Sequence, residues 1–298
     1  MRILAFLLLL LTLTGCTERG PIDLPGLEGQ ARGGDSGAIR QLVDLLARPE
    51  NDLSSRSYAI LADLGQAAVP ALLDAIDTPD RVQREHVIAA LGNLKVGKAV
   101  PAIIEVLENP ELGRRYVAAW ALGEIGDPAA VPALVAALGD RDAEVRKYAT
   151  RSLIKFNRQA VPSLLAYLPN APVEGAAGAI RALGDIADRR ALEPLLARVG
   201  GPNRRDVYLA LGKLRDSGAE QALIAGLQDP DWRVRMNAAM ALGPLGGPAA
   251  AAALEETRED DVMVVREWSA RSLEMITGKH STYRNARGEY VAPYKIYH

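Results

Sequence analysis

The sequence has few of the residues that usually carry chemistry or crosslinks. Its 298 residues include one cysteine and three histidines, and aromatic residues make up only 5%. One cysteine excludes an internal disulfide framework, and no Cys/His grouping has the spacing of a zinc site. With 35 basic against 37 acidic residues the net charge is −2, which argues against nucleic acid as a partner. Because aromatic residues are few, we expect a core of Ala, Leu and Val, and such small side chains suit closely spaced helices.

Motifs that mark catalytic sites are also missing. No phosphate-binding Gly-x-Gly-x-x-Gly follows a strand pattern and no Gly-x-Ser-x-Gly elbow occurs. His86, His280 and His298 stand far apart in the chain, and we interpret His86 as a structural residue beside a helix stripe. The acidic run at 255–261 has oxygen ligands that suit Ca²⁺, although a solvated helix end is the simpler interpretation. The sequence thus predicts no enzyme, no cofactor and no metal.

The first sixteen residues indicate an export signal. Residues 3–13 are almost wholly apolar, and about 11 residues are too few to span a bilayer, which needs roughly 20. The run ends in four residues that resemble the bacterial lipobox: Leu13, Thr14, Gly15 and Cys16. That resemblance implies a signal peptide over residues 1–15 and a diacylglycerol on Cys16. Thr17 in the next position implies a lipid-anchored protein of the cell envelope, on the periplasmic face of the outer membrane in a Gram-negative cell.

Residues 16–36 are rich in glycine and proline. They contain Gly20, Gly26, Gly29, Gly33 and Gly34 together with two prolines. Because both residue types disfavour regular helix, we predict a flexible tether here. About 20 such residues span roughly 25 Å on average, which would hold the folded part close to a membrane.

The remainder of the chain repeats one unit. Its most regular mark is a leucine that recurs at intervals of 28 to 31 residues: Leu61, Leu91, Leu122, Leu153, Leu183, Leu211, Leu242 and Leu273. Around Leu122, apolar or small residues lie at i, i+3, i+4 and i+7, the stripe of an amphipathic helix. Gly126 can close that helix, and a Val-Pro pair at 131–132 can begin a second one. Each unit is therefore predicted to be a helix, a tight turn and a helix.

Small residues mark the stripe where neighbouring helices must meet. Ala or Ser precedes the recurring leucine in every unit except the first, where Ile60 precedes Leu61. Glycine follows the leucine directly in five units: Gly92, Gly123, Gly184, Gly212 and Gly243. One pair of helices cannot bury its stripe alone, whereas a stack of pairs makes a continuous core. We predict an all-α fold, an α-solenoid of about eight repeats over residues 37–279. Residues 280–298, rich in tyrosine, would then form a cap or a tail.

The repeat resembles a known family. The resemblance lies in Asp142, Val145, Arg146 and Ala149 to Leu153, in the matching residues 231–243, and in the Val-Pro pairs. These features resemble the HEAT and HEAT-like repeats, including the short form named after phycobilisome lyases. The resemblance implies a superhelix that offers an extended surface to other macromolecules.

One arginine recurs at an equivalent position: Arg84, Arg115, Arg146, Arg204, Arg235 and Arg266. Four of the six have an acid four residues earlier, so a ladder of helix caps and ion pairs is the interpretation we favour. In the HEAT family, similar residues connect adjacent repeats, which agrees with this interpretation. The alternative interpretation is that the arginines form a stripe that binds an anionic polymer. The unit of Leu183 departs from the pattern: Ala176 replaces the arginine, and Gly175 and Gly178 stand inside its first helix. We interpret this unit as a weak spot, and the alternative is a hinge or a close-contact site for a partner.

These patterns lead to one main hypothesis. We predict a non-catalytic, membrane-anchored scaffold or adaptor of the cell envelope that binds a protein or peptide on its concave face. Tryptophan and arginine are enriched in binding hot spots, and five residues are candidates for partner binding: Trp120, Trp232, Arg115, Arg146 and Arg235. The alternatives are a lyase-like factor, which the lyase-type repeat implies, and a protein that binds an anionic polymer.

Overall fold

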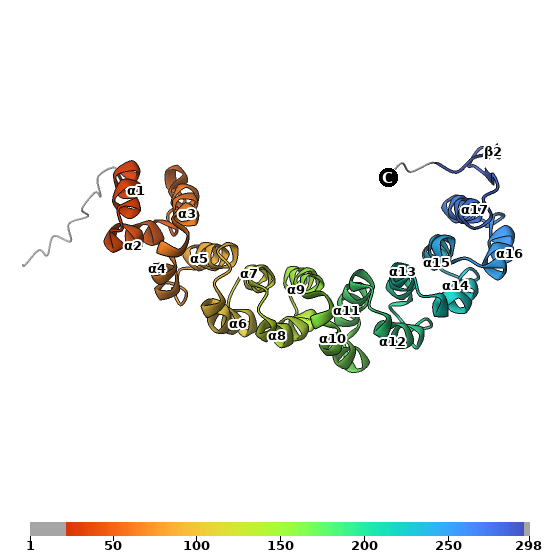
Figure 1. Cartoon of the computed structure of the whole chain (residues 1–298), viewed down its shortest axis with the longest axis horizontal. Helices are drawn as coiled ribbons and strands as arrows, with labels where there is room; N and C mark the ends of the chain where they lie inside the picture. The colour runs from red at the N-terminus through yellow and green to blue at the C-terminus, as the bar shows by residue number, and fades with distance from the viewer. Residues whose placement is uncertain (1–21, 295–298) are drawn as a thin grey trace, which may run out of the picture.

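The computed structural model describes residues 22–294, which form an open arc of paired helices (Figure 1). The predicted signal peptide and Cys16 lie outside the described residues. The described residues form seventeen α-helices and one small hairpin, so the predicted all-α solenoid is confirmed. No helix among residues 22–294 is both long and apolar enough to span a membrane.

The first helix of each pair lines the concave side of the arc, and the second lies on the convex side (Figure 1). After α1 (Leu24–Arg32) and α2 (Ser36–Leu45), the concave helices are α3 (Leu53–Leu64), α5 (Arg81–Asn93), α7 (Tyr116–Ile125), α9 (Ala143–Phe156), α11 (Val173–Ile186), α13 (Arg204–Leu214), α15 (Trp232–Leu245) and α17 (Met263–Thr277). The convex helices are α4 (Val69–Asp74), α6 (Val100–Glu108), α8 (Val131–Ala136), α10 (Val161–Tyr167), α12 (Leu192–Leu196), α14 (Glu220–Gly226) and α16 (Pro248–Thr257).

Single 3₁₀ turns fill most of the connections. They are Glu50–Asp52, Gly65–Ala67, Gly97–Ala99, Pro128–Ala130, Ala137–Gly139, Asn157–Gln159, Leu168–Asn170, Arg189–Ala191 and Ser217–Ala219. Gly126 closes α7 in the left-handed conformation, with φ 75°, as its position predicted. Gly246, which follows α15, does not adopt the left-handed conformation, because its φ is −61°. Glycine is needed at this position because a Cβ would collide with Ile276 of α17.

The expected tether is wrong over Leu24–Arg32. These residues form α1, whose Leu24 and Ala31 are buried against the first full pair. Asp23 caps the helix by accepting a hydrogen bond from the backbone N–H of Gly26 at 3.0 Å. Pro25 stands in the first turn, where its missing N–H costs nothing. Packing of two apolar residues thus outweighs a glycine content that disfavours helix.

The last repeat has one helix only. After α17 the chain forms an antiparallel hairpin of β1 (Tyr283–Arg284) and β2 (Tyr290–Val291), with Tyr283 opposite Val291. The side chain of Arg266 donates to the carbonyl of Arg284 at 2.7 Å, which holds the hairpin on α17. Tyr283 is buried, whereas Tyr290 and Tyr294 are 63% and 75% exposed. The hairpin therefore takes the place of the second helix, and one of the described tyrosines supplies its buried contact.

Neighbouring concave helices approach each other until backbone meets backbone. A Cβ added to Gly123 would lie 2.5 Å from Cβ and 3.0 Å from Cα of Ser152 in the next unit. The same collision would occur between Gly184 and Ala210, at 2.7 Å from both Cα and Cβ. Gly92, Gly212 and Gly243 face Ala121, Ala241 and Ser272 in the same way. The predicted close approach at these glycines is confirmed.

Where the facing small residue is serine, it also bonds across the seam. The hydroxyl of Ser152 donates to the carbonyl of Ala119 at 2.8 Å, and that of Ser272 to the carbonyl of Ala239 at 2.7 Å. Both serines are buried, so each bond satisfies a hydroxyl that burial would otherwise leave without a partner.

The recurring arginines link one unit to the next. Arg115 is buried and forms two hydrogen bonds, of 2.5 and 2.9 Å, with the carboxylate of Asp140, which lies in the loop before α9. It also donates to the carbonyl of Leu107 at 3.0 Å. Arg235 pairs with Asp260 in the same way, at 2.7 and 2.9 Å. In each case the acid stands 25 residues after the arginine.

Three of the four acids that stand four residues before the arginines are helix caps, as predicted, but they do not form the predicted ion pairs with those arginines. Asp80, Asp142 and Asp231 accept hydrogen bonds from backbone N–H groups of the first helical turn, at 2.8 to 3.0 Å. They are helix N-caps. The arginine instead reaches back to loop carbonyls, as Arg146 does to the carbonyl of Asp140 at 2.7 Å.

The ladder is incomplete in the middle of the arc. The residue 25 positions after Arg146 is Ala171, and in the next unit Ala176 and Gly201 replace both partners. Gly175 is needed here because a Cβ would collide with the hydroxyl of Tyr167, which has no hydrogen-bond partner among the described residues. This unit therefore lacks the buried ion pair that joins repeats elsewhere.

Gly123→Ala tests the backbone contact between units. Ala normally stabilises a helix interior by about 0.5–1 kcal/mol relative to Gly, but here the added methyl should destabilise by about 1–3 kcal/mol through overpacking. Gly29→Ala in α1 is the matched control, because its Cβ would meet nothing within 4 Å. Thermal unfolding should show a lower Tm for Gly123→Ala only. An equal shift in both variants would contradict the close approach.

Arg115→Ala tests the buried ion pair. Removing Arg115 leaves the partly buried Asp140 carboxylate without its cationic partner, which should cost about 3 kcal/mol in the free energy of unfolding at pH 7. Arg32→Ala is the control, because Arg32 pairs with Asp63 on the surface and its loss should barely change the free energy of unfolding.

The cost of Arg115→Ala should also depend on pH. Burial alone would raise the pKa of Asp140, but hydrogen bonds from Arg115 and from the backbone of Asp142 outweigh it and hold this pKa below its usual range. Stability from a lowered pKa is present above the unfolded value, about 3.9, and is lost as the pH falls through the folded one. The difference between the two proteins should therefore shrink below about pH 4. A constant difference down to pH 2 would exclude this pair as its source.

Candidate functional site

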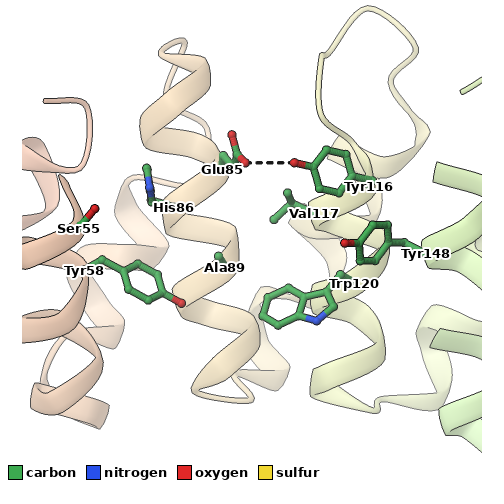
Figure 2. Close-up of a pocket in the computed structure, with 9 residues that line it drawn as sticks. All are labelled: Ser55, Tyr58, Glu85, His86, Ala89, Tyr116, Val117, Trp120 and Tyr148. Carbon is green, nitrogen blue, oxygen red and sulfur yellow. Dashed lines mark hydrogen bonds between the residues drawn. The ribbon is translucent and has the colours of Figure 1, made fainter. Parts of the chain in front are cut away.

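A pocket of about 390 Å³ lies on the concave face near the N-terminal end of the arc (Figure 2). Four successive concave helices contribute to it: α3, α5, α7 and α9. Its lining residues are Ser55, Tyr58, Glu85, His86, Ala89, Tyr116, Val117, Trp120 and Tyr148. Five of the nine carry rings, in a chain with few aromatic residues.

The repeat itself brings these side chains together. Ala89 and Trp120 stand two residues before the recurring leucine of their units, and His86 and Tyr148 stand five before it. Residues three apart lie on one helix face, so these positions form two rows along the concave surface. The leucines point into the core, and the rows beside them remain partly exposed. Three of the five rings, those of His86, Trp120 and Tyr148, therefore stand in these two rows, whereas Tyr58 and Tyr116 occupy other positions of their units.

The rings are arranged for contact with a flat ligand. Those of Tyr116 and Tyr148 have centroids 5.2 Å apart and an interplanar angle of 32°. Those of Tyr58 and His86 are 6.1 Å apart and tilted by 58°. Trp120 projects between these two pairs in Figure 2. Rigid aromatic side chains of this kind bind with little loss of conformational entropy and prefer aromatic or conjugated partners.

Polar groups are spread around the pocket. The hydroxyl of Tyr116 donates to Glu85 at 3.4 Å (Figure 2). Glu85 also forms an ion pair with Arg114. Nδ1 of His86 lies 2.9 Å from the carbonyl of Val82. Since a carbonyl only accepts, Nδ1 carries the proton, which leaves Nε2 of the neutral ring as an acceptor.

Ionisation is suppressed for two of the pocket's phenols, Tyr58 and Tyr116. Burial raises the pKa of Tyr58, although a hydrogen bond from Asn93 opposes the effect. Burial and the nearby Glu85 carboxylate raise the pKa of Tyr116. The Tyr116 hydroxyl donates to Glu85, whereas the Tyr58 hydroxyl accepts from Asn93 and keeps its proton for a ligand.

The structure brings one of the five predicted partner-binding residues into this pocket, Trp120. Trp232 is partly buried at the start of α15, where the guanidinium of Arg233 lies 4.5 Å from its ring centroid. Arg115, Arg146 and Arg235 donate to other parts of the chain and lie outside the pocket. Their part in partner binding stays a prediction. The sequence analysis did not predict the pocket tyrosines and interpreted His86 as a structural residue, because neither the tyrosines nor His86 belong to the buried stripe.

The acidic run at 255–261 is part of the arginine ladder. Arg235 pairs with Asp260 and with Asp261, the latter at 2.7 Å. Arg258, which stands within this run, donates to the carbonyl of Thr282 at 3.0 Å and so helps to hold the hairpin. Across residues 22–294, no three His, Cys, Asp or Glu side chains gather as metal ligands.

One curated protein matches part of this chain. The chain is 40% identical to phycocyanobilin lyase subunit alpha of Picosynechococcus sp. over 80 residues, which are 24% of this chain and 30% of that protein. The match thus spans under a third of the relative's length. The relative is a lyase subunit, and it overturns our prediction that the chain has no catalytic role.

Solved structures resemble the chain over most of its length. The complex of CpcE and CpcF of phycocyanin lyase from Nostoc sp. is 25% identical over 68% of this chain and 86% of that one, but its TM-score of 0.39 is too low to carry an argument. Importin beta is 13% identical over 83% of this chain and 42% of that one, with a TM-score of 0.60. The similarity to importin beta concerns the fold alone, which is an α-solenoid.

The family of HEAT repeats matches the chain in five overlapping segments: residues 39–122, 69–154, 100–177, 131–210 and 201–274. Together they cover well over half of the sequence and coincide with the helix pairs from α2 to α17. The chain belongs to the HEAT-repeat family.

Proposed function

We propose that this HEAT-repeat protein has a lyase-like function. Its aromatic pocket would hold a planar, conjugated ligand of the bilin class, and a protein partner would dock along the rest of the concave face. The observation that carries the proposal is the pocket of Tyr58, His86, Tyr116, Trp120 and Tyr148. The match to phycocyanobilin lyase subunit alpha supports the choice of ligand class.

The lining suits such a ligand physically. A conjugated ring system can stack on Trp120 and on the Tyr116 and Tyr148 pair, and contacts of this kind are worth about 0.5–1.5 kcal/mol each beyond area burial. The phenol hydroxyls and Nε2 of His86 can bond polar atoms on its edge. A pocket of about 390 Å³ takes only part of an open-chain tetrapyrrole, so the remainder would stay exposed to a second protein.

The same groups could assist chemistry. A lyase adds a group to a double bond or eliminates one, and either step moves a proton. Nε2 of His86 can accept a proton, and the hydroxyl of Tyr58, which accepts a hydrogen bond from Asn93, can donate a hydrogen bond in the same cleft. The geometry thus offers a base and a hydrogen-bond donor beside the site where a conjugated ligand would lie.

A protein partner fits the shape of the arc. Solenoids of helix pairs present long concave surfaces, and the concave helices continue from α11 to α17 beyond the pocket (Figure 1). A partner that carries the ligand or receives it could contact this surface and the exposed edge of the ligand at once.

Trp120→Ala should weaken ligand binding at least tenfold, because it removes the ring at the centre of the pocket. Phycocyanobilin is titrated into the purified full-length chain, and binding is measured by the change in its visible absorption and by induced circular dichroism. Trp120→Phe keeps a stacking surface and should retain most of the affinity.

Trp232→Ala is the matched control, since Trp232 is also a partly buried tryptophan on a concave helix but lies outside the pocket. It should bind phycocyanobilin as the unsubstituted chain does. Equal losses in both tryptophan variants, or no induced signal with the unsubstituted chain, would refute the proposed pocket.

Membrane anchoring through Cys16 is a separate proposal. It rests on the lipobox-like residues 13–16 and concerns where the protein works, in the cell envelope. Cells that express the chain with an alkyne-tagged fatty acid should yield a labelled, membrane-associated protein, and Cys16→Ser should abolish both properties. Label on neither form, or equally on both, would remove the anchor.

A further inference from the structure

Two cationic side chains flank Tyr148, the pocket residue that α9 contributes. Lys147 and Arg151 flank Tyr148 on α9, and their cationic groups lie 5.6 and 5.5 Å from its ring centroid. Arg151 stands two residues before the recurring Leu153, the position that Ala89 holds on α5 and Trp120 on α7. Both of those residues line the pocket, so Arg151 is the next member of the same row.

Carboxylates near the pocket already have cationic partners. Glu85 pairs with Arg114, Glu144 with Lys147 at 3.0 Å, and Glu124 with Lys155. Arg151 takes part in no ion pair with the residues that the structure describes, and its side chain is exposed. The wall next to Tyr148 therefore keeps a positive charge that this chain does not neutralise.

The guanidinium of Arg151, close to the ring of Tyr148 and outside any ion pair among the described residues, is well placed to bind an anion. The paired N–H donors of a guanidinium match the two oxygens of a carboxylate. Arg181 shows the contrast: it has the same repeat position on α11, but Asp206 lies 3.5 Å away and occupies it.

We propose that Arg151 recognises a carboxylate of the ligand whose conjugated rings lie in the aromatic pocket. The ligand is thus a conjugated carboxylic acid of low molecular weight, with its acidic arm directed towards α9. This inference rests on the proposed function and narrows it to one chemical feature of the ligand. A neutral ring system of the same shape would lose the contact with Arg151.

The test compares two probes on the full-length chain: phycocyanobilin as the free diacid and phycocyanobilin dimethyl ester. The unsubstituted chain should bind the diacid about tenfold more tightly than the ester, the range expected for a charge-assisted hydrogen bond. Arg151→Gln should weaken the diacid about tenfold and leave the ester unchanged, so that the preference disappears. Arg151→Lys should keep part of it, because it retains the charge without the paired donors.

Arg181→Gln is the matched control and should leave both affinities unchanged. Because Arg151 is exposed, its removal should not affect the Tm, which is measured for each variant. If the unsubstituted chain binds diacid and ester equally, the carboxylate contact is wrong while the proposed pocket stands. If Arg181→Gln abolishes the preference as Arg151→Gln does, general surface charge is responsible and the inference fails. If neither probe binds, the inference fails together with the proposed function.

Discussion

The structure depends on how closely one concave helix can approach the next. At five places the contact is glycine against the backbone of alanine or serine, so side-chain bulk does not separate the helices. Because the concave helices meet this closely, the stack curves towards their side (Figure 1). This curvature directs the side chains of the rows beside the recurring leucines towards the concave side of the arc. Residues from four units can then line one pocket, although successive units are about 30 residues apart in sequence.

Much of this architecture could be predicted from the sequence, because repetition averages out local ambiguity. A leucine at a constant interval identifies the unit, and glycine two places after the small residue identifies the seam. The ends of the array were harder. Neither α1 nor the terminal hairpin has a second copy to compare with, and both depend on packing against a neighbour. Leu24 and Ala31 outweigh the local glycines in α1, and Arg266 holds the hairpin by bonding to a backbone carbonyl that no pattern reveals.

The candidate site was predicted only in part, for a physical reason. A periodic arginine looks the same in sequence whether it points to solvent or into the seam between units. In the structure Arg115 is buried against Asp140, and the sequence does hold the signal, an acid 25 residues later that is present for Arg115, Arg204 and Arg235. The pocket tyrosines have the opposite character, since Tyr58, Tyr116 and Tyr148 stand three, six and five residues before the leucines of their units and so share no position with one another. Only the curvature of the assembled array brings them together, and amphipathic periodicity does not fix its direction.

Gly92 is where the seam and the pocket meet. A Cβ at this position would lie 2.8 Å from Cβ of Ala121, which makes it part of the close approach between α5 and α7. The same Cβ would lie 3.2 Å from Cζ3 of Trp120, so the missing side chain also makes room for the indole. The contact that sets the spacing of these two units therefore also sets the depth at which the indole lies. Elsewhere the two roles are separate, because the buried seam carries the stability while the rows beside it, including Arg151, stay partly exposed and can vary without disturbing the stack. An unchanging seam beside a variable concave row is an arrangement in which ligand chemistry can change while the fold does not.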